Sequence, residues 1–486
     1  MRLSRSNLVN LPASIERPGY DPAKLAIGIV HLGIGAFHRA HEAVFTDAVL
    51  ARDPSWGISG VSLRSPDTSD ALAPQDNLYT LAVRDGDKEA LRIIGSIVET
   101  LVAPQDPERV LRRMSDPAVR IVSLTVTEKG YCHSPATGEL DESHPDIVHD
   151  LADPQRPKSA PGFIVEALAR RRAAGIQSFT LLSCDNLPAN GQTLKRIVTR
   201  FAALRDPDLG QFVATVAAPS TMVDRIVPAT TDADRAAVSA MLGATDAWPI
   251  VTEPFSQWVV EDDFPAGRPA WEEAGAVFSP DVTAFELMKL RLLNGSHSTL
   301  AYLGFLAGAN TVAEAMALPG MEELIEGMMM DEISPTLPAL SGFDLAAYRR
   351  ALLDRFRNKA LHHRTAQIAM DGSQKLPQRL LNTIRDRLKA GAPFERLALG
   401  VSAWMRYASG IDEHGNAIKV QDPLAGRIAG LVGPLRDPEE IVAAFLGLKE
   451  VFGEDLPETN AFTRTVTQKF IGLVGAGAAA SIEKPI

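Results

Sequence analysis

The sequence has few of the features that mark secreted, membrane-spanning or zinc-binding proteins. Only two of its 486 residues are cysteine, Cys132 and Cys184, and neither belongs to a Cys-x-x-Cys pair or another zinc-binding spacing. A chain with so little cysteine is typical of a reduced compartment. The N-terminal residues lack the apolar core of a signal peptide, and no run of about 18 apolar residues occurs. We therefore expect a cytoplasmic protein with no membrane segment and no metal site.

An excess of positive charge is also absent. Lysine and arginine total 49 residues against 60 aspartates and glutamates, which gives a net charge of -11 and a pI near 5.5. Proteins that bind nucleic acids or anionic membranes usually carry a basic surface, so we expect neither as a partner. The charge balance places no limit on a small-molecule substrate, because one cationic pocket can lie in an acidic surface.

The length and the order of the elements predict two domains. A chain of 486 residues is too long for a single ordinary core. In its first half, predicted helices at 107–114 and 162–174 alternate with predicted strands at 25–32, 56–63, 91–98, 119–126 and 178–183. This order predicts an α/β fold with a doubly wound sheet of the Rossmann type. Beyond residue 284 helical patterns dominate, so we place the domains at 1–284 and 285–486, the second one mainly α-helical.

The strand at 25–32 runs into Gly33-Ile34-Gly35, and a helix is expected from there through Leu50. A strand, a glycine-rich turn and a helix form the order that places a pyrophosphate at a helix N-terminus. Gly33 would permit the tight turn, and Gly35 would let the backbone approach the phosphate. His38 stands where the third glycine of the Gly-x-Gly-x-x-Gly pattern would be, and many such turns only connect two elements. The flanking strand and helix favour a dinucleotide site.

In doubly wound sheets, ligands bind beyond the carboxyl ends of the strands. Arg64 and Asp67 follow the second strand, whose end normally distinguishes NAD from NADP. Asp67 would favour NAD by binding the ribose, whereas Arg64 would suit the 2'-phosphate of NADP, and either side chain can instead be solvated. Thr127 and Asn186 follow two later strands, although asparagine in such a turn is also a common helix cap. We expect NAD as the cofactor and leave NADP open.

The segment 285–306 contains no proline, is rich in leucine and methionine, and is predicted to be a helix that is apolar on most sides. At 100° per residue, four polar groups share one arc of this helix. Relative to Lys289, the angles are roughly 60° for Glu286, 80° for His297 and 140° for Asn294. Burial tends to lower the pKa of a lysine, which can then accept a proton. A purely structural pair of Lys289 with Glu286 is the alternative.

Four motifs occur in order along the chain. They are Gly33-x-Gly35-x-Phe37-His38-Arg39-x-His41, Thr125-Val126-Thr127-Glu128-Lys129-Gly130-Tyr131, Ser183-Cys184-Asp185-Asn186 and Lys289-x-Arg291-x-x-Asn294-x-x-His297. Together they resemble the polyol-specific long-chain dehydrogenases, also called the mannitol dehydrogenase family. The resemblance implies an expanded Rossmann domain, a mainly helical second domain and zinc-independent, NAD(P)-dependent oxidation of a secondary alcohol.

The resemblance also implies a role for each matching residue. Lys289 would be the general base, and Asn186 and Asn294 would stabilise the alkoxide. His297 would orient the substrate. Asp224 and Glu286 match positions that line the substrate site or its proton path. The expected cofactor residues, from the glycine turn and the strand ends, are Gly33, Gly35, Ala36, Phe37, Asp67 and Thr127.

The stretch 367–379 distinguishes subgroups of this family. Its Gln-Lys-Leu-Pro-Gln-Arg run is more similar to the fructuronate reductases (D-mannonate oxidoreductases) than to the mannitol 2-dehydrogenases, which carry arginine where this chain has Gln367. A hexonate needs a cation for its carboxylate, and we name Lys375 and Arg379 as its binding residues. Each can instead be an ordinary surface charge. Further candidates are His362, His363 and Arg364.

The sequence thus predicts an NAD-dependent oxidoreductase that interconverts D-mannonate and D-fructuronate. The alternative in the same class is a mannitol 2-dehydrogenase or a related arabinitol or sorbitol dehydrogenase. A third interpretation is a protein that binds a nucleotide without turnover. The set of lysine, asparagine and histidine argues against it, because binding alone requires no buried lysine. The expected partner is a small molecule, and the resemblance favours a monomer.

Overall fold

The computed structural model describes residues 1–134, 137–340 and 342–484. The chain divides into two compact units, Met1–Thr283 (unit 1) and Ala284–Ile486 (unit 2). Unit 1 contains a parallel sheet with helices, and the described residues of unit 2 form helices and no strands. The predicted fold class, a Rossmann-type domain followed by a mainly α-helical domain, is confirmed. Within the described ranges, no helix is both long and apolar enough to cross a membrane.

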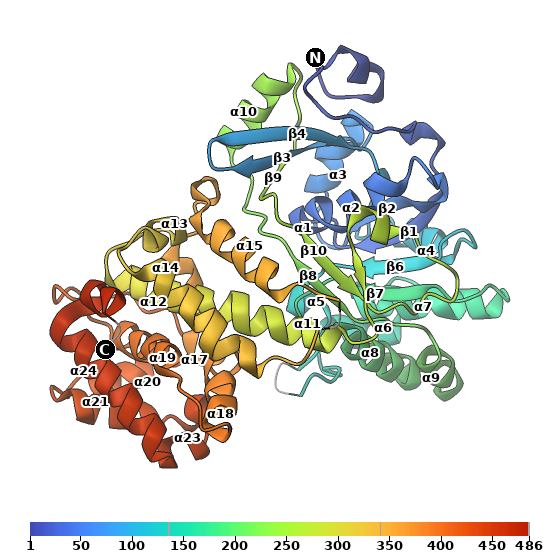
Figure 1. The fold of residues 1–486 in the computed structure, drawn as a ribbon. Coiled ribbons are helices and arrows are strands. Elements are labelled where there is room, and N and C mark those ends of the chain that lie inside the picture. The colour runs from blue at the N-terminus through green and yellow to red at the C-terminus, as the bar shows by residue number, and fades with distance from the viewer. Residues whose placement is uncertain (135–136, 341, 485–486) are drawn as a thin grey trace. The chain divides into compact units, whose positions relative to one another are not determined.

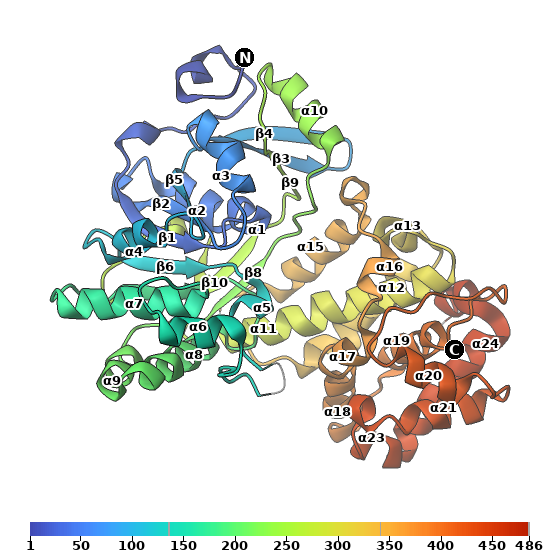
Figure 2. The same ribbon diagram turned by 180° about the vertical axis from the view of Figure 1, so that it is seen from behind.

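The principal sheet of unit 1 is parallel and has the strand order β5-β2-β1-β6-β7. Its strands are β1 Ile27–Leu32, β2 Gly57–Ser62, β5 Ile97–Val102, β6 Ile121–Leu124 and β7 Thr180–Ser183. Figure 2 shows β5, β2, β1 and β6 one after another. The chain passes from β1 to β2 on one side and returns to β6 on the other. The order therefore reverses at β1, and doubly wound sheets bind ligands at the carboxyl ends of strands where this happens.

The two faces of this sheet belong to different cores, because successive residues of a strand point to opposite sides. Val30 and Leu32 of β1 belong to one core, together with residues of α4 Pro107–Ser115, α7 Ala160–Ala173 and α8 Asn190–Arg205. Ile29 belongs to the other core, together with residues of α2 Glu42–Val49 and the side chains of Trp258 and Trp271. Figure 1 shows α7 and α8 on one side of the sheet and α2 on the other. Both faces are covered, which explains why the strands are buried almost throughout.

Two smaller sheets complete unit 1, with the orders β4-β3-β9 and β11-β10-β8. Their strands are β3 Tyr79–Asp85, β4 Lys88–Ile94, β9 Ile250–Thr252, β8 Thr221–Asp224, β10 Gln257–Val260 and β11 Val277–Phe278. The single strand predicted at 91–98 is wrong, because β4 ends at Ile94 and β5 begins at Ile97. The two strands belong to different sheets, and Gly95 lies between them. A Cβ on Gly95 would lie 3.0 Å from the ring of Pro22.

The remaining helices of unit 1 are α1 Ala36–Ala40, α3 Asp67–Leu72, α5 Thr127–Gly130, α6 Pro145–Ala152, α9 Pro207–Ala214 and α10 Asp232–Leu242. The continuous helix predicted through Leu50 is also wrong. It is divided into α1 and α2, because His41 has φ -124° and ψ -96°, outside the helical region. The side chain of His41 is buried, and its Nε2 lies 3.0 Å from the carbonyl oxygen of Gln257.

Unit 2 is built around α12 Ser296–Leu306, an apolar helix in which almost every residue is buried. This helix packs against α13 Val312–Met316, α16 Thr365–Ile368, α19 Glu395–Ala408 and α24 Asn460–Glu483. The other α-helices are α11 Val282–Met288, α14 Met321–Gly327, α15 Leu345–Arg357, α17 Gly372–Leu376, α18 Asn382–Lys389, α20 Ala425–Val432, α21 Pro438–Leu446, α22 Lys449–Phe452 and α23 Asp455–Glu458. Among the described residues of this unit, three segments are π-helical: η6 Lys289–Gly295, η7 Met328–Ile333 and η10 Pro377–Leu381.

Candidate functional site

The turn after β1 is held by both neighbouring strands. Gly33 has φ +95°, a left-handed conformation that glycine adopts without strain. Its N–H donates to the Val61 carbonyl at 2.9 Å, and a Cβ on Gly33 would lie 2.2 Å from the carbonyl oxygen of Thr125. The turn itself therefore requires Gly33. The turn does not require glycine at Gly35, the N-cap residue of α1, because the nearest atom to a Cβ there lies 3.8 Å away.

A cavity of about 260 Å³ lies at the carboxyl ends of β1, β2 and β6. It is lined by the glycine turn, by the end of β2, by the segment after β6 and by the start of α7. Three predicted cofactor residues, Gly33, Gly35 and Thr127, line this one cavity. Arg64 and Lys158 add positive charge to the same lining.

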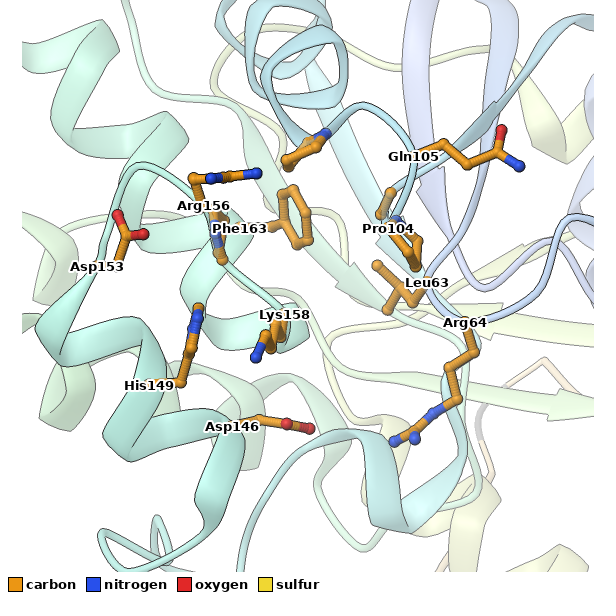
Figure 3. Close-up of a pocket in the computed structure, with 13 residues that line it drawn as sticks. Leu63, Arg64, Pro104, Gln105, Asp146, His149, Asp153, Arg156, Lys158 and Phe163 are labelled. Carbon is orange, nitrogen blue, oxygen red and sulfur yellow. The ribbon is translucent and has the colours of Figure 1, made fainter.

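A second cavity of about 520 Å³ adjoins the first, since Arg64 and Lys158 line both. Figure 3 shows Phe163 facing Pro104 and Leu63 across this cavity, so that part of its wall is apolar. The charged and polar part of its lining comprises Arg64, Gln105, Asp146, His149, Asp153, Arg156 and Lys158. The two cavities together offer one apolar wall, several cations and the exposed backbone of the glycine turn.

The other predicted cofactor residues lie outside the lining of both cavities. Ala36 and Phe37 form the start of α1. Asp67 is exposed at the start of α3, where its carboxylate accepts a hydrogen bond from the Ser65 hydroxyl at 3.0 Å. At this strand end it is Arg64, the alternative to Asp67, that lines the cavities.

The backbone after β6 is held by a carboxylate that sequence reasoning missed. Asp185 accepts hydrogen bonds from the N–H groups of Val126 at 3.0 Å and Thr127 at 3.1 Å. It also accepts one from the hydroxyl of Tyr131 at 2.8 Å. Thr127 has φ +62°, a strained conformation for a residue other than glycine. Burial raises the pKa of Asp185. The hydrogen bonds that Asp185 accepts from the backbone hold Thr127 in the lining of the first cavity.

Asn186 and Asp224 lie at strand ends in unit 1. Asn186 is exposed in the bend that follows β7. Asp224 is the last residue of β8 and only 5% exposed, and it pairs with Gln257 in the antiparallel register of β8 and β10. The stabilisation of an alkoxide by Asn186 and the contact of Asp224 with a substrate stay predictions.

Asn190 is a second residue that sequence reasoning missed as a part of the site. It is fully buried, and its amide nitrogen lies 2.9 to 3.1 Å from the carbonyl oxygens of Ser183, Asp185 and Thr221. Asn190 thus connects the end of β7 to the start of β8 and holds the bend that carries Asn186. In the sequence Asn190 looks like an ordinary residue at a helix start. Its role cannot be read there, because one of its three partners lies 31 positions away.

The segment that carries Lys289 departs from the predicted α-helix. Lys289 and Asn294 both lie in the π-helix η6, between α11 and α12. The i→i+5 hydrogen bonds of a π-helix take more residues into each turn. The predicted separation of about 140° between Lys289 and Asn294 is therefore wrong, because residues five apart lie on adjacent turns and point in more similar directions. Single π-helical turns within longer helices are frequent at functional sites.

His297 follows η6 and lies in an aromatic and basic environment. It is 8% exposed, its ring stacks on Phe356 at 5.1 Å, and it meets His363 edge-on at 4.8 Å. Burial, together with the charges of His363, Arg355 and Arg379, lowers the pKa of His297 well below its ordinary value. His297 is therefore a neutral imidazole at neutral pH, which can donate one hydrogen bond and accept another.

Of the two predicted carboxylate-binding residues, Arg379 lies close to this histidine, and Lys375 lies close to Arg379. The Nη1 atom of Arg379 donates to the hydroxyl of Ser298, the neighbour of His297, at 3.0 Å, and burial lowers the pKa of Arg379. The Nζ atom of Lys375 donates to the Met370 carbonyl at 2.5 Å. Burial, followed by the charge of Arg379, lowers the pKa of Lys375. Arg379 thus lies near His297 on one side and near Lys375 on the other.

One buried group of three side chains offers enough ligands for a metal ion, His31, His38 and Glu42. Its two imidazole rings are stacked 3.4 Å apart, with an angle of 15° between their planes. The nitrogen lone pairs lie in the planes of their rings. Because the planes are nearly parallel, the lone pairs cannot converge on one ion with the geometry that zinc requires.

A second such group, at the rim of the first cavity, comprises Cys132, His144 and Asp146. Burial, followed by the nearby carboxylates, raises the pKa of Cys132 to about 12. Without a bound ion the thiol therefore stays protonated at neutral pH, whereas zinc binds the thiolate. The Nδ1 atom of His144 already accepts a hydrogen bond from the Asp146 N–H at 3.2 Å. A metal ion at this group would have to displace the thiol proton and to bind His144 through Nε2.

The sequence was compared with protein families and with curated proteins. The family described as the mannitol dehydrogenase Rossmann domain matches residues 27–273, and the mannitol dehydrogenase C-terminal domain matches residues 281–474. The D-mannonate oxidoreductase of Escherichia coli (strain K12) is 47% identical over 475 residues, which cover 96% of this chain and 97% of the relative. The mannitol 2-dehydrogenase of Pyrenophora tritici-repentis is 41% identical over 495 residues, which cover 100% of this chain and 86% of that protein.

The fold was compared with solved structures. The mannitol 2-dehydrogenase of Pseudomonas fluorescens, solved as a ternary complex with NAD and D-mannitol, matches with a TM-score of 0.83. The two chains are 41% identical, and the match covers 99% of each. The similarity therefore extends over both units.

Proposed function

Because the chain belongs to the mannitol dehydrogenase family of oxidoreductases, we propose that it is an NAD-dependent enzyme that interconverts D-mannonate and D-fructuronate. The observation that carries this proposal is the basic environment of His297, whose pKa is lowered by burial and then by the charges of His363, Arg355 and Arg379. A hexonate brings a carboxylate to such groups, whereas a polyol brings no charge. The relative named D-mannonate oxidoreductase supports the same substrate class.

A polyol 2-dehydrogenase acting on mannitol, arabinitol or sorbitol is the second candidate. It is favoured by the similarity to the Pseudomonas fluorescens enzyme, whose structure holds D-mannitol. The residues proposed for proton transfer and alkoxide stabilisation would serve either substrate. The two candidates differ in what Arg379 and Lys375 would bind, a carboxylate in the first and hydroxyl groups in the second.

The residues of unit 1 fit a dinucleotide. The glycine turn leaves space at Gly35, where the nearest atom to a Cβ lies 3.8 Å away, so a phosphate can approach the backbone. The adjoining cavities provide the apolar wall at Phe163 and the cations Arg64 and Lys158. We propose that Gly33, Gly35 and these side chains hold NAD, which supplies or accepts the hydride when it is bound. Ala36, Phe37 and Asp67 are proposed to contribute from the starts of α1 and α3.

The side chains of the protein manage the proton and the charge of the substrate oxygen. In the oxidative direction we propose that Lys289 accepts the hydroxyl proton, and in the reductive direction that it returns the proton. The amides of Asn294 and Asn186 would donate hydrogen bonds to the developing alkoxide. The neutral imidazole of His297 would bind a neighbouring substrate hydroxyl, either as donor or as acceptor. Glu286, three residues before Lys289, would exchange the proton with solvent.

We propose that the substrate carboxylate binds Arg379 and Lys375. An arginine presents several N–H donors in a plane that matches a carboxylate, and Ser298 accepts from one of those of Arg379. Lys375 adds a second cation, and the mutual repulsion of the two cations, which contributes to the lowered pKa of Lys375, would be relieved by a bound anion.

Replacing Arg379 with glutamine is expected to discriminate between acid and polyol substrates. The kcat/KM for fructuronate should fall about 10- to 100-fold, because hydrogen bonds to charged groups contribute roughly 1.5 to 3 kcal/mol. The kcat/KM for fructose should change less than about threefold. Arg387→Gln is the matched control, since Arg387 is also buried in unit 2 and donates to the Pro393 carbonyl at 2.9 Å. Equal losses for both substrates would show that Arg379 is structural.

We also expect turnover to survive prolonged dialysis against EDTA. Among the described residues, the two groups with three potential metal ligands include none of the residues to which the chemistry is assigned. Proton transfer is assigned to Lys289 instead. Initial rates before and after chelation measure this directly. A loss of activity that added Zn²⁺ restores would contradict the proposed mechanism.

A further inference from the structure

A buried polar cluster adjoins the glycine turn. His31 of β1, His38 of α1 and Glu42 of α2 are each at most 1% exposed. The Oε2 atom of Glu42 lies 3.0 Å from Nδ1 of His31 and 3.2 Å from Nδ1 of His38, and Nδ1 of His31 also lies 2.8 Å from the hydroxyl oxygen of Ser123. Burial acts to raise the pKa of Glu42, but the hydrogen bonds from the two histidines outweigh burial and hold this pKa below its ordinary range. Glu42 is therefore a buried carboxylate that contacts Nδ1 of both stacked imidazole rings.

Of these three side chains, His31 is the one that reaches the turn. Its Nε2 lies 2.8 Å from Oγ1 of Thr125 and 3.2 Å from the carbonyl oxygen of Gly33. Thr125 donates its hydroxyl hydrogen to the same carbonyl at 2.8 Å, so Nε2 of His31 is the donor towards Thr125. The N–H of Gly35 also donates to this carbonyl, at 2.6 Å. The Gly33 carbonyl thus accepts from the Thr125 hydroxyl and the Gly35 N–H, and Nε2 of His31 holds the Thr125 hydroxyl in the direction of this carbonyl.

The direction of this carbonyl determines the conformation of the turn. Rotation of the peptide that carries this carbonyl would change ψ of Gly33 and φ of Ile34, and it would remove the acceptor of the Gly35 N–H. Both glycines line the cavity at the carboxyl ends of the strands, whereas His31 and Glu42 lie outside its lining. An influence of His31 or Glu42 on a bound cofactor must therefore pass through the turn.

We propose that His31, oriented by Glu42, is a positioning residue for the cofactor, which fixes the Gly33 carbonyl and with it the backbone that receives NAD. This inference rests on the proposed placement of NAD at the glycine turn. It predicts a higher dissociation constant and a higher KM for NADH when the contact is lost. The kcat at saturating NADH and the KM for the keto substrate should stay nearly unchanged, because the reacting groups are different residues.

Two substitutions of His31 separate the contacts made by its Nδ1 atom from the contacts made by its Nε2 atom. In His31→Asn the amide can replace Nδ1 and keep Glu42, but it is too short to reach Thr125 and Gly33. In His31→Gln the amide nitrogen can occupy the position of Nε2 and keep the turn. We expect the dissociation constant of NADH, measured by fluorescence titration without substrate, to rise about 10-fold or more in His31→Asn. In His31→Gln it should rise less than about threefold.

His38→Asn is the matched control, because His38 has the same burial and the same carboxylate partner, and its described hydrogen bond is to Glu42. It should change the dissociation constant less than about threefold. If both His31 variants fail to fold, the nearly isosteric Glu42→Gln variant should raise this constant about threefold to 10-fold.

Three outcomes would count against the proposal. NADH affinity equal to that of the wild type in folded His31→Asn or Glu42→Gln would overturn the inference. An equal loss of affinity in His38→Asn would also overturn it, because disturbing the cluster anywhere would then suffice. A wild-type protein that does not bind NADH would instead refute the placement of the cofactor.

Discussion

Replacing Lys289 with alanine is expected to lower kcat/KM by at least about 10²-fold, because a positioned general base typically contributes 10²- to 10⁴-fold. Lys289 is half-buried at the start of η6, and Asn294, five residues on in the same π-helix, lies on the next turn. Alanine removes the amine without introducing a larger side chain, so the helix should persist. Initial rates of NADH oxidation at 340 nm measure the loss, and circular dichroism checks the fold.

Lys469→Ala is the control for Lys289. Lys469 is another lysine of unit 2, in α24; it is buried, and burial lowers its pKa. Its removal tests whether the loss of any buried amine reduces turnover, and we expect kcat/KM to change less than about threefold. Near-normal turnover in Lys289→Ala would remove Lys289 from the mechanism. A comparable loss in both variants would show that stability, and not proton transfer, had been measured.

Replacing Gly33 with alanine is expected to abolish tight binding of NADH. The new Cβ would lie 2.2 Å from the Thr125 carbonyl oxygen, and the φ of +95° is strained for any residue with a Cβ. Either the turn or the end of β6 must move, and both line the cavity assigned to the cofactor. We expect the dissociation constant of NADH to rise at least about 10-fold, together with a lower Tm.

Gly35→Ala provides the comparison that separates fold from cofactor contact. The nearest atom to its Cβ lies 3.8 Å away, so the protein alone can accommodate this change and the Tm should stay close to that of the wild type. We nevertheless expect weaker NADH binding, because a methyl group would occupy the space that a phosphate needs. Unchanged affinity in Gly35→Ala would contradict the proposed contact between the phosphate and this residue.

The predictions that succeeded rest on local order along the chain. The strand, the Gly33-Ile34-Gly35 turn and the following helical residues are consecutive, and their hydrophobic pattern is enough to predict a Rossmann-type unit. The loss of strand and helix alternation beyond residue 284 likewise predicts a mainly helical second unit. The family could be predicted because four motifs, spread from Gly33 to His297, keep their spacing.

The features that could not be predicted depend on distant partners or on small changes of helical phase. His31 meets Thr125 across 94 positions, and Asp185 meets Thr127 across 58, so no window of sequence contains either pair. The π-helix at Lys289 leaves the apolar pattern of the segment intact while it changes the directions of the side chains. His41 interrupts the predicted helix, because its buried ring meets Gln257 of β10. The sequence also could not show that Arg64, and not Asp67, lines the cavity.

The initial rate of NADH oxidation at 340 nm, with fructuronate and with fructose assayed separately, tests the proposed function most directly. The basic groups around His297 predict that kcat/KM for fructuronate exceeds that for fructose by at least about 10-fold, the contribution of one charged hydrogen bond. An equal or higher kcat/KM for fructose would contradict the assignment of a sugar acid and would make the protein a polyol dehydrogenase.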